Sequence, residues 1–262
     1  MSSMFASCAI TSVPLFNTAS VTGMDSMFSE CTRLTSIPLF DTSKVTNMSS
    51  MFENTLAFNR SLNWNVSSVT NMSNMFKNAS AFNGFISNWN TSNVTNMSGM
   101  FQNASSFNQP INYNSNTGSW DVSNVTNMSA MFKNALVFNQ PIANWNVSNV
   151  TNMNEMFSGA TIFNNDISNW TVNNVTPKPP TNFVYYSALI KDNNPFKTYY
   201  PITPSLLLAD FNKTRVDQPF DITSLLDRGG SFGAITSESS NPNVATILNN
   251  IVTIKGNGTT TI

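Results

Sequence analysis

The chain has 262 residues, of which only 10% are charged, and its formal net charge is -1. A hydrophobic content of 40% is enough for a sizeable core, so a disordered chain is excluded. The near-neutral charge gives no basis for binding nucleic acid or anionic lipid, because both depend on clustered Lys and Arg. The polar surface must therefore be built mainly from Asn, Ser and Thr.

A repeated segment organises the chain as far as Thr176. One copy reads VTNMSGMF and begins at Val94. The first Met-Phe pair, Met4-Phe5, lacks the leading part of this segment, so we expect the chain to be a fragment. Steps of 24, 24, 25, 31, 25 and 25 residues separate the equivalent valines, and a period in this range is typical of solenoids and related arrays. These valines are Val21, Val45, Val69, Val94, Val125, Val150 and Val175.

Each unit combines a helix-like stretch with an extended one. Apolar residues follow the i, i+3, i+4, i+7 spacing of a short amphipathic helix at Met97, Met100, Phe101 and Ala104. The extended stretch of the second unit reads LTSIPLF, which has the spacing of a leucine-rich-repeat strand. We therefore predict an α/β solenoid, leucine-rich-repeat-like, of about seven turns.

Two kinds of column recur from unit to unit. Every Trp lies five residues before a repeat valine, and we expect these rings to form a buried ladder. A carbohydrate-stacking platform with the indoles facing water is the alternative. Asparagines recur as well, for example at Asn78, Asn103 and Asn134, and we expect an inward-facing amide ladder. Other repeated asparagines lie in glycosylation sequons, but their number follows from the repetition.

The two cysteines share one repeat position. Cys8 and Cys31 each lie three residues after the Phe of a Met-Phe pair, where later units carry Thr55, Ala79, Ala104, Ala135 and Ala160. This pattern indicates a small buried side chain. A disulfide between stacked turns in an oxidising compartment is the alternative.

One unit carries an insertion of six residues between Ile111 and Trp120. Insertions in repeat arrays form loops on one face, and such loops often bind partners, although neutral drift in loop length is the simpler explanation. We expect Tyr113 to be an exposed aromatic anchor for a partner. The candidate partner-binding loop comprises Asn112, Tyr113, Asn114, Ser115, Asn116, Thr117, Gly118 and Ser119.

The repeats stop at Pro177, and the composition of the chain then changes twice. We predict a repeat solenoid at 1–176, a Pro/Tyr-rich cap and linker at 177–204, and a partial immunoglobulin-like β domain at 205–262. Two β-rich runs around Asn249 and Asn250 predict a hairpin.

The sequence motifs that carry common enzyme chemistry are missing. Histidine is absent, the cysteines lack C-x-x-C spacing, and no glycine-rich phosphate loop occurs. The acidic residues fall at different repeat positions, so no recurrent calcium loop is formed from them. No apolar run reaches the roughly 18 residues of a membrane span. We therefore expect no enzyme, no cofactor and no metal site.

With the repeat residues laid out, the pattern VTNMSxMFxNAxxFNQPIxNWNVSN resembles the BspA-like leucine-rich-repeat surface-protein family of the mycoplasma-lipoprotein type. The segments SSNPNVAT and VTIKGNGTTTI resemble the front of a bacterial group 2 immunoglobulin-like domain. The resemblance implies a non-catalytic protein of the cell surface, the extracellular space or a virion surface, in which repeats are displayed on immunoglobulin-like spacers.

Three functions compete. The first is a non-enzymatic surface module for adhesion or interaction, whose partner is a protein or glycan on a cell surface. The second is a virion or sheath component that contacts coat or sheath subunits. The third is ice or mineral binding by the column Thr46, Thr70, Thr95, Thr126 and Thr151, although its parallel column is mixed: Thr42, Val66, Thr91, Val122 and Val147.

Overall fold

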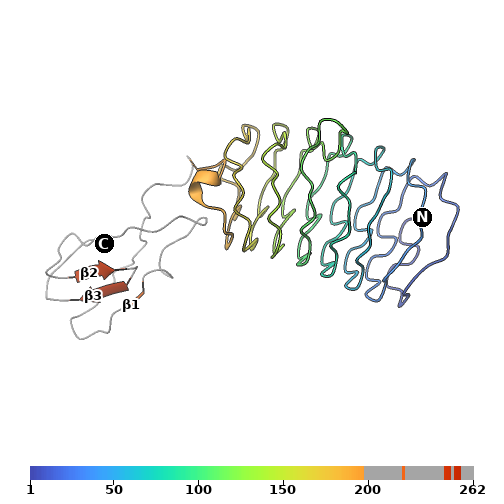
Figure 1. Cartoon of the computed structure of the whole chain (residues 1–262), viewed down its shortest axis with the longest axis horizontal. Coiled ribbons are helices and arrows are strands. Elements are labelled where there is room, and N and C mark those ends of the chain that lie inside the picture. Colours follow the sequence, from blue (N-terminus) through green and yellow to red (C-terminus); the bar gives the residue numbers. More distant parts are fainter. Residues whose placement is uncertain (198–219, 222–244, 249–250, 255–262) are drawn as a thin grey trace.

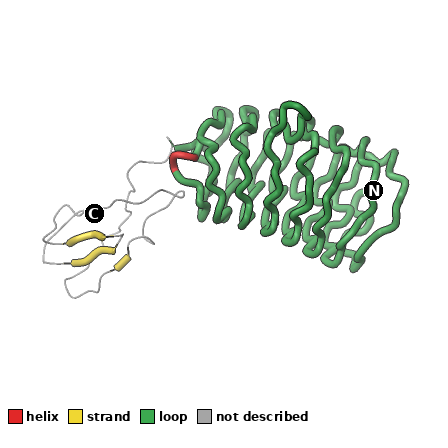
Figure 2. The backbone as a smooth tube through the Cα atoms, viewed as in Figure 1, coloured by secondary structure: helices red, strands yellow, loops and turns green. Residues whose placement is uncertain are grey.

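The computed structural model describes residues 1–197, 220–221, 245–248 and 251–254. Residues 1–197 form a row of narrow coils, one coil per repeat unit, with the N-terminus at one end (Figures 1 and 2). Each coil is named here by its first valine, so residues 94–124 are the Val94 coil. Parallel bridges pair the same repeat position in successive coils: Gly23 with Asn47, Asn47 with Asn71, Asn71 with Asn96, Asn96 with Asn127, and Asn127 with Asn152.

The stretch expected to be helical is a series of turns instead. We call residues 97–104 and their equivalents the turn segment. The Phe101 N–H donates to the Met131 carbonyl of the next coil at 2.9 Å, whereas the Gln102 N–H donates to the Gly99 carbonyl at 3.0 Å. This alternation continues along the segment, and an α-helix would need i to i−4 bonds throughout. The helix prediction was wrong for these segments, because half of their amides bond to the neighbouring coil.

Two residues of each turn segment adopt the left-handed conformation. Gly99 has φ 62° and Asn103 has φ 58°, in a region that Gly and Asn tolerate better than other residues. These two positions redirect the chain every four residues and so replace the helix with turns. The other pairs are Ser3 and Ser7, Ser26 and Glu30, Ser50 and Asn54, Asn74 and Asn78, Ala130 and Asn134, Glu155 and Gly159, and Asn182 and Tyr186.

Columns of parallel aromatic rings fill the interior of the stack. The Phe of each turn segment stacks on its neighbours at centroid distances of 5.5–5.8 Å, from Phe5 to Phe157. A second column runs from Phe58 to Phe163 at 5.8–6.1 Å. The two columns meet within each coil, where the Phe101 and Phe107 centroids are 3.9 Å apart. This interior is continuous along the stack.

The Trp side chains form the buried ladder that the sequence predicts. The Trp120 ring stacks on Trp89 at 6.4 Å and on Trp145 at 6.3 Å. All five indoles are at most 5% exposed. The Trp120 indole N–H also donates to the Ile86 carbonyl at 3.0 Å, and the same bond recurs for three other Trp residues. The Trp ladder is confirmed, and the alternative of a carbohydrate platform is wrong because no indole faces water.

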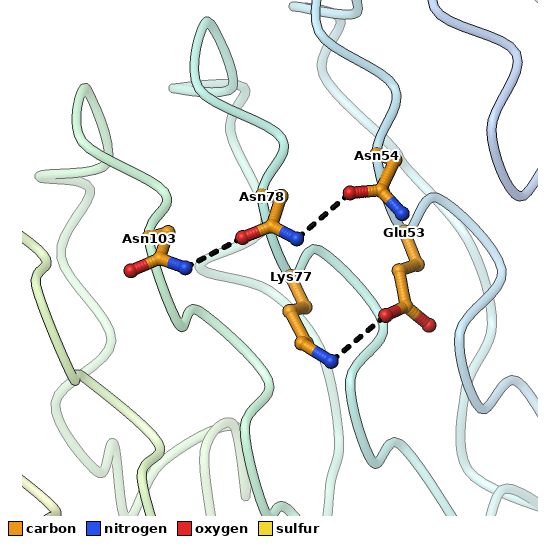
Figure 3. Close-up of polar contacts among 5 residues, drawn as sticks. All are labelled: Glu53, Asn54, Lys77, Asn78 and Asn103. Atoms are coloured by element: carbon orange, nitrogen blue, oxygen red, sulfur yellow. Dashed lines mark hydrogen bonds and ion pairs between the residues drawn. The ribbon is translucent and has the colours of Figure 1, made fainter.

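Asparagine amides form a ladder on the outside of the stack (Figure 3). The Asn78 side-chain amide donates to Asn54 Oδ1 at 2.7 Å, and Asn103 donates to Asn78 at 2.6 Å. Asn134 extends the ladder by donating to Asn103 at 2.8 Å. The ladder predicted from the sequence is confirmed, but its inward orientation was wrong, because these side chains are half-buried or exposed. Their column coincides with the second left-handed position.

Residues after Thr176 form a further coil on the Val150 coil. The Phe157 N–H donates to the Phe183 carbonyl at 2.9 Å, as in the preceding coils. The Phe183 ring lies edge-on to Phe157, with an interplanar angle of 86°, and so interrupts the parallel stacking. The 3-10 helix η1 (Lys191–Asn193) follows, and its Asn193 carbonyl accepts the Ile167 N–H at 3.0 Å. The predicted cap and linker extend to residue 204, and residues 198–204 lie outside the described part.

Three short strands are described in the C-terminal region: β1 (Phe220–Asp221), β2 (Ala245–Leu248) and β3 (Ile251–Ile254). They form one antiparallel sheet in the order β1-β3-β2. The pairing of β2 with β3 runs from Ala245 with Ile254 to Leu248 with Ile251. This pairing confirms the predicted hairpin. The remaining residues of the predicted immunoglobulin-like domain are not among those described.

We expect the Phe101→Ala substitution to reduce the free energy of unfolding by about 3–5 kcal/mol, because Phe101 is fully buried and other rings enclose it on both sides. Phe5→Ala should cost less, since the Phe5 side chain is only partly buried. Urea denaturation of both variants measures the difference. Equal shifts of the two midpoints would contradict a core that is enclosed most tightly at the centre of the stack.

A second pair of variants tests the left-handed position. Asn103→Gly and Asn103→Ala both remove the ladder amide. Alanine keeps the Cβ that disfavours φ 58° and loses the side-chain amide that makes asparagine tolerant of it, whereas glycine has no Cβ. We expect the alanine variant to be less stable than the glycine variant by about 1 kcal/mol. Gly159 occupies the equivalent position naturally. Equal stability in urea melts would show that backbone conformation does not select this column.

Candidate functional site

The insertion loop, residues 112–119, leaves the stack between two fully buried side chains, Ile111 and Trp120. It forms a small hairpin in which Asn114 and Ser119 are paired by an antiparallel bridge. The Asn114 N–H donates to the Ser119 carbonyl at 3.0 Å. The hairpin lies in the green part of the stack in Figure 1, where one coil is wider than its neighbours. The six extra residues are therefore accommodated at one edge of the stack.

Bonds within the hairpin order its tip. The Asn114 backbone carbonyl accepts the Gly118 N–H at 2.8 Å. The Asn114 side-chain Oδ1 accepts the Asn116 N–H at 3.0 Å. Gly118 has φ 68°, which suits glycine at a tight reversal. The hydroxyls of Thr117 and Ser119 lie 2.8 Å apart. The loop therefore presents one defined conformation.

A side chain of the next coil anchors the base of the hairpin. Asn144 accepts the Tyr113 N–H at 3.2 Å through Oδ1 and donates to the Tyr113 carbonyl at 2.7 Å through Nδ2. Sequence analysis missed this residue. An asparagine just before Trp also occurs at Asn63, Asn88 and Asn169, and this recurrence is the signal that could have revealed it.

The structure corrects the role expected for Tyr113. Its side chain is half-buried and packs against the hydrophobic core, so the ring is less exposed than expected. Ser119 is 4% exposed and belongs to the base of the loop. The exposed residues of the insertion are Asn112, Asn114, Ser115, Asn116 and Thr117. The accessible chemistry of the loop is therefore neutral amides and hydroxyls.

The return of the loop into the stack is strained. Trp120 has φ 52°, which is unusual for a bulky residue and costs on the order of 1–3 kcal/mol. Stacking on both Trp neighbours and the indole bond to Ile86 hold it there. The strained residue directly follows the insertion, so the strain lies where the loop rejoins the stack.

Charged groups contribute little to the described surface. Lys77 Nζ lies 3.0 Å from Glu53 Oε1 beside the asparagine ladder, as Figure 3 shows, and Lys133 lies 2.9 Å from Glu155. Such partly exposed surface pairs contribute about 1 kcal/mol or less each. Hydrogen bonds from the Ser43 hydroxyl and N–H lower the pKa of the Asp41 carboxyl, but this bonding closes a local turn.

The threonine surface offers one column and not two. Thr95 is exposed, and its hydroxyl donates to the Thr70 carbonyl at 3.2 Å, a bond that recurs along the column. The parallel column considered with it is buried, as Thr42 and Val122 show. The second row of an ice-binding face is therefore not available at those positions.

No group of three His, Cys, Asp or Glu side chains in the described part of the chain could hold a metal ion. No helix among these residues is long and apolar enough to cross a membrane.

We expect Tyr113→Ala and Asn116→Ala to separate the base of the loop from its tip. Tyr113→Ala removes a half-buried ring and should reduce the free energy of unfolding by about 1–2 kcal/mol. Asn116→Ala changes an exposed side chain and should stay within about 0.5 kcal/mol of the parent. Urea melts provide the measurement. A Tyr113→Ala variant as stable as the parent would show that the ring does not support the loop.

Comparison with known proteins gives one family. The family model described as "Mycoplasma protein of unknown function, DUF285" matches residues 1–63, 22–117 and 111–189. Searches of curated proteins and of solved structures give no match. The matched segments overlap and run from the first coil into the coil that follows Thr176. Since they cover well over half of the chain, the protein belongs to the DUF285 family.

Proposed function

We propose that this protein is a non-enzymatic repeat protein displayed at a cell surface or in the extracellular space, where it acts in adhesion or as an interaction module. In this proposal the coils form a solenoid of the BspA-like type, and residues 205–262 belong to an immunoglobulin-like spacer. Membership of a family with mycoplasma-type repeats supports the proposal. So does a described surface in which neutral amides and hydroxyls accompany exposed apolar side chains such as Leu39 and Phe85, with few charges.

The hairpin at residues 112–119 is the observation that carries the proposal. Most other coils present similar polar side chains at equivalent positions, so their surfaces differ little from one another. The hairpin differs in both shape and composition. Its internal bonds and its anchor at Asn144 fix it before a partner arrives, which reduces the conformational entropy lost on binding.

The chemistry of the tip limits the class of partner. Asn114, Asn116 and Thr117 offer neutral donors and acceptors, and the loop contains no charged residue. Protein backbones and glycan hydroxyls are suitable partners for such groups. Binding through this loop should therefore depend only weakly on salt, in contrast to recognition of polyanions.

The test replaces residues 112–119 with Ala-Asn, the pair found at Ala143 and Asn144. This change restores the 25-residue step and removes the strained return at Trp120, which offsets the lost packing of Tyr113. We expect the variant to remain folded. Binding to a printed glycan array and to intact cells should fall by at least about tenfold, which corresponds to 1.4 kcal/mol.

A matched control changes the exposed threonine column instead of the hairpin. Thr95→Val and Thr126→Val together alter the exposed threonine column and keep the β-branched shape. This control should bind like the parent. Full binding by the folded loop-replacement variant would refute the hairpin as the recognition site. Self-association in sedimentation that survives the replacement would favour the virion or sheath alternative.

A further inference from the structure

The first two coils bring both cysteines of the chain to one position. The Phe5 N–H donates to the Met27 carbonyl at 3.0 Å, and the Ser7 N–H donates to the Ser29 carbonyl at 2.8 Å. This register places Cys8 opposite Cys31. Both occupy the small-residue column of the turn segment, and both thiols are free in this structure.

Bonds around one carbonyl show how close the cysteines are. The Cys31 thiol donates to the Phe5 carbonyl at 2.9 Å, and the Cys8 N–H donates to the same oxygen at 3.1 Å. Paired strands lie about 4.8 Å apart, and disulfides join Cα atoms separated by about 4.4–6.8 Å. We infer from this pairing that the two cysteines lie within the Cα range of a bridge without a change of register.

We propose that Cys8 and Cys31 are a redox modification site that closes into a reversible disulfide between the first two coils. The oxidant is a small-molecule disulfide of the glutathione type. This inference concerns the N-terminal coils and does not depend on the function proposed for the hairpin.

The order of attack follows from exposure. Cys8 is partly exposed, whereas Cys31 is fully buried. The Cys8 thiolate attacks the small disulfide, forms a mixed disulfide and releases one thiolate. The Cys31 thiolate then attacks the Cys8 sulfur, and the second small thiolate leaves. The two leaving thiolates take up the protons lost by the two cysteines, so one disulfide is exchanged for another.

The environment of Cys31 agrees with its role in the second step. Burial raises the pKa of the Cys31 thiol, although the Cys8 N–H opposes this change. A negative charge on Cys8 raises the Cys31 pKa further. A thiol with a raised pKa ionises less readily, which agrees with Cys31 reacting after the more exposed Cys8.

The bridge would act on the coil with the least enclosed interior. Phe5 and Phe16 are only partly buried, whereas their equivalents in the central coils are buried. Local opening is easiest where few side chains are enclosed. A covalent link to Cys31 would hold this coil in register and slow its opening.

The experiment uses the full chain incubated with oxidised glutathione. Cleavage before Asp25 and after Arg33 separates the cysteines into peptides 1–24 and 25–33. We expect these peptides to stay linked until a reductant is added, and the intact chain to lose its reaction with N-ethylmaleimide. Amide exchange at residues 3–8 should slow by at least about tenfold in the bridged form.

The variants Cys8→Ala and Cys31→Ala are matched controls, because alanine fills this column at Ala79, Ala104, Ala135 and Ala160. Both should fold, and neither should give the linked peptides. Two results would overturn the proposal: recovery of only a glutathione adduct at Cys8 with Cys31 still reduced, or links formed only between separate chains.

Discussion

Backbone pairing between successive coils is the constraint on which the rest of the structure depends. In each turn segment, alternate amides donate to the next coil, as the Phe101 N–H does to the Met131 carbonyl at 2.9 Å. This pairing fixes the separation of the coils. Once it is fixed, equivalent side chains must stack, so each interior column keeps one kind of side chain, such as Phe, Trp, Met or Val. The chain therefore repeats its residue types because it repeats its hydrogen bonds.

The same constraint explains why an insertion is tolerated and why it is conspicuous. The Met97 N–H bonds to the Asn127 carbonyl at 3.0 Å across the insertion, much as Met72 bonds to Asn96 at 2.9 Å without one. The register of the turn segments is thus kept. The extra residues therefore project from the edge of the stack. A surface that recognises a partner needs a feature that its neighbours lack, and residues 112–119 supply one.

The sequence predicted the columns better than the conformation that builds them. The Trp column and the apolar Met-Phe positions lie where the repeat places them, because burial depends on position within the period. The helix at residues 97–104 was wrong because consecutive turns give the same apolar spacing as a helix. The distinguishing signal is the four-residue interval between Gly99 and Asn103, both left-handed, which a helix does not require. The burial of Tyr113 could not be predicted, because it depends on how the loop folds back onto the stack, whereas the recurrence of Asn before Trp was a usable signal for Asn144.

Native-state hydrogen exchange tests the central claim most directly, since it measures the bonds between coils one amide at a time. The account predicts that the Phe101 and Asn103 amides, which donate to the Val125 coil, exchange only through global unfolding. The Phe5 amide, in the least enclosed coil, should exchange faster. Exchange of Phe101 and Asn103 at the rate of the Asn116 amide at the exposed tip of the hairpin would contradict an architecture held together by pairing between coils.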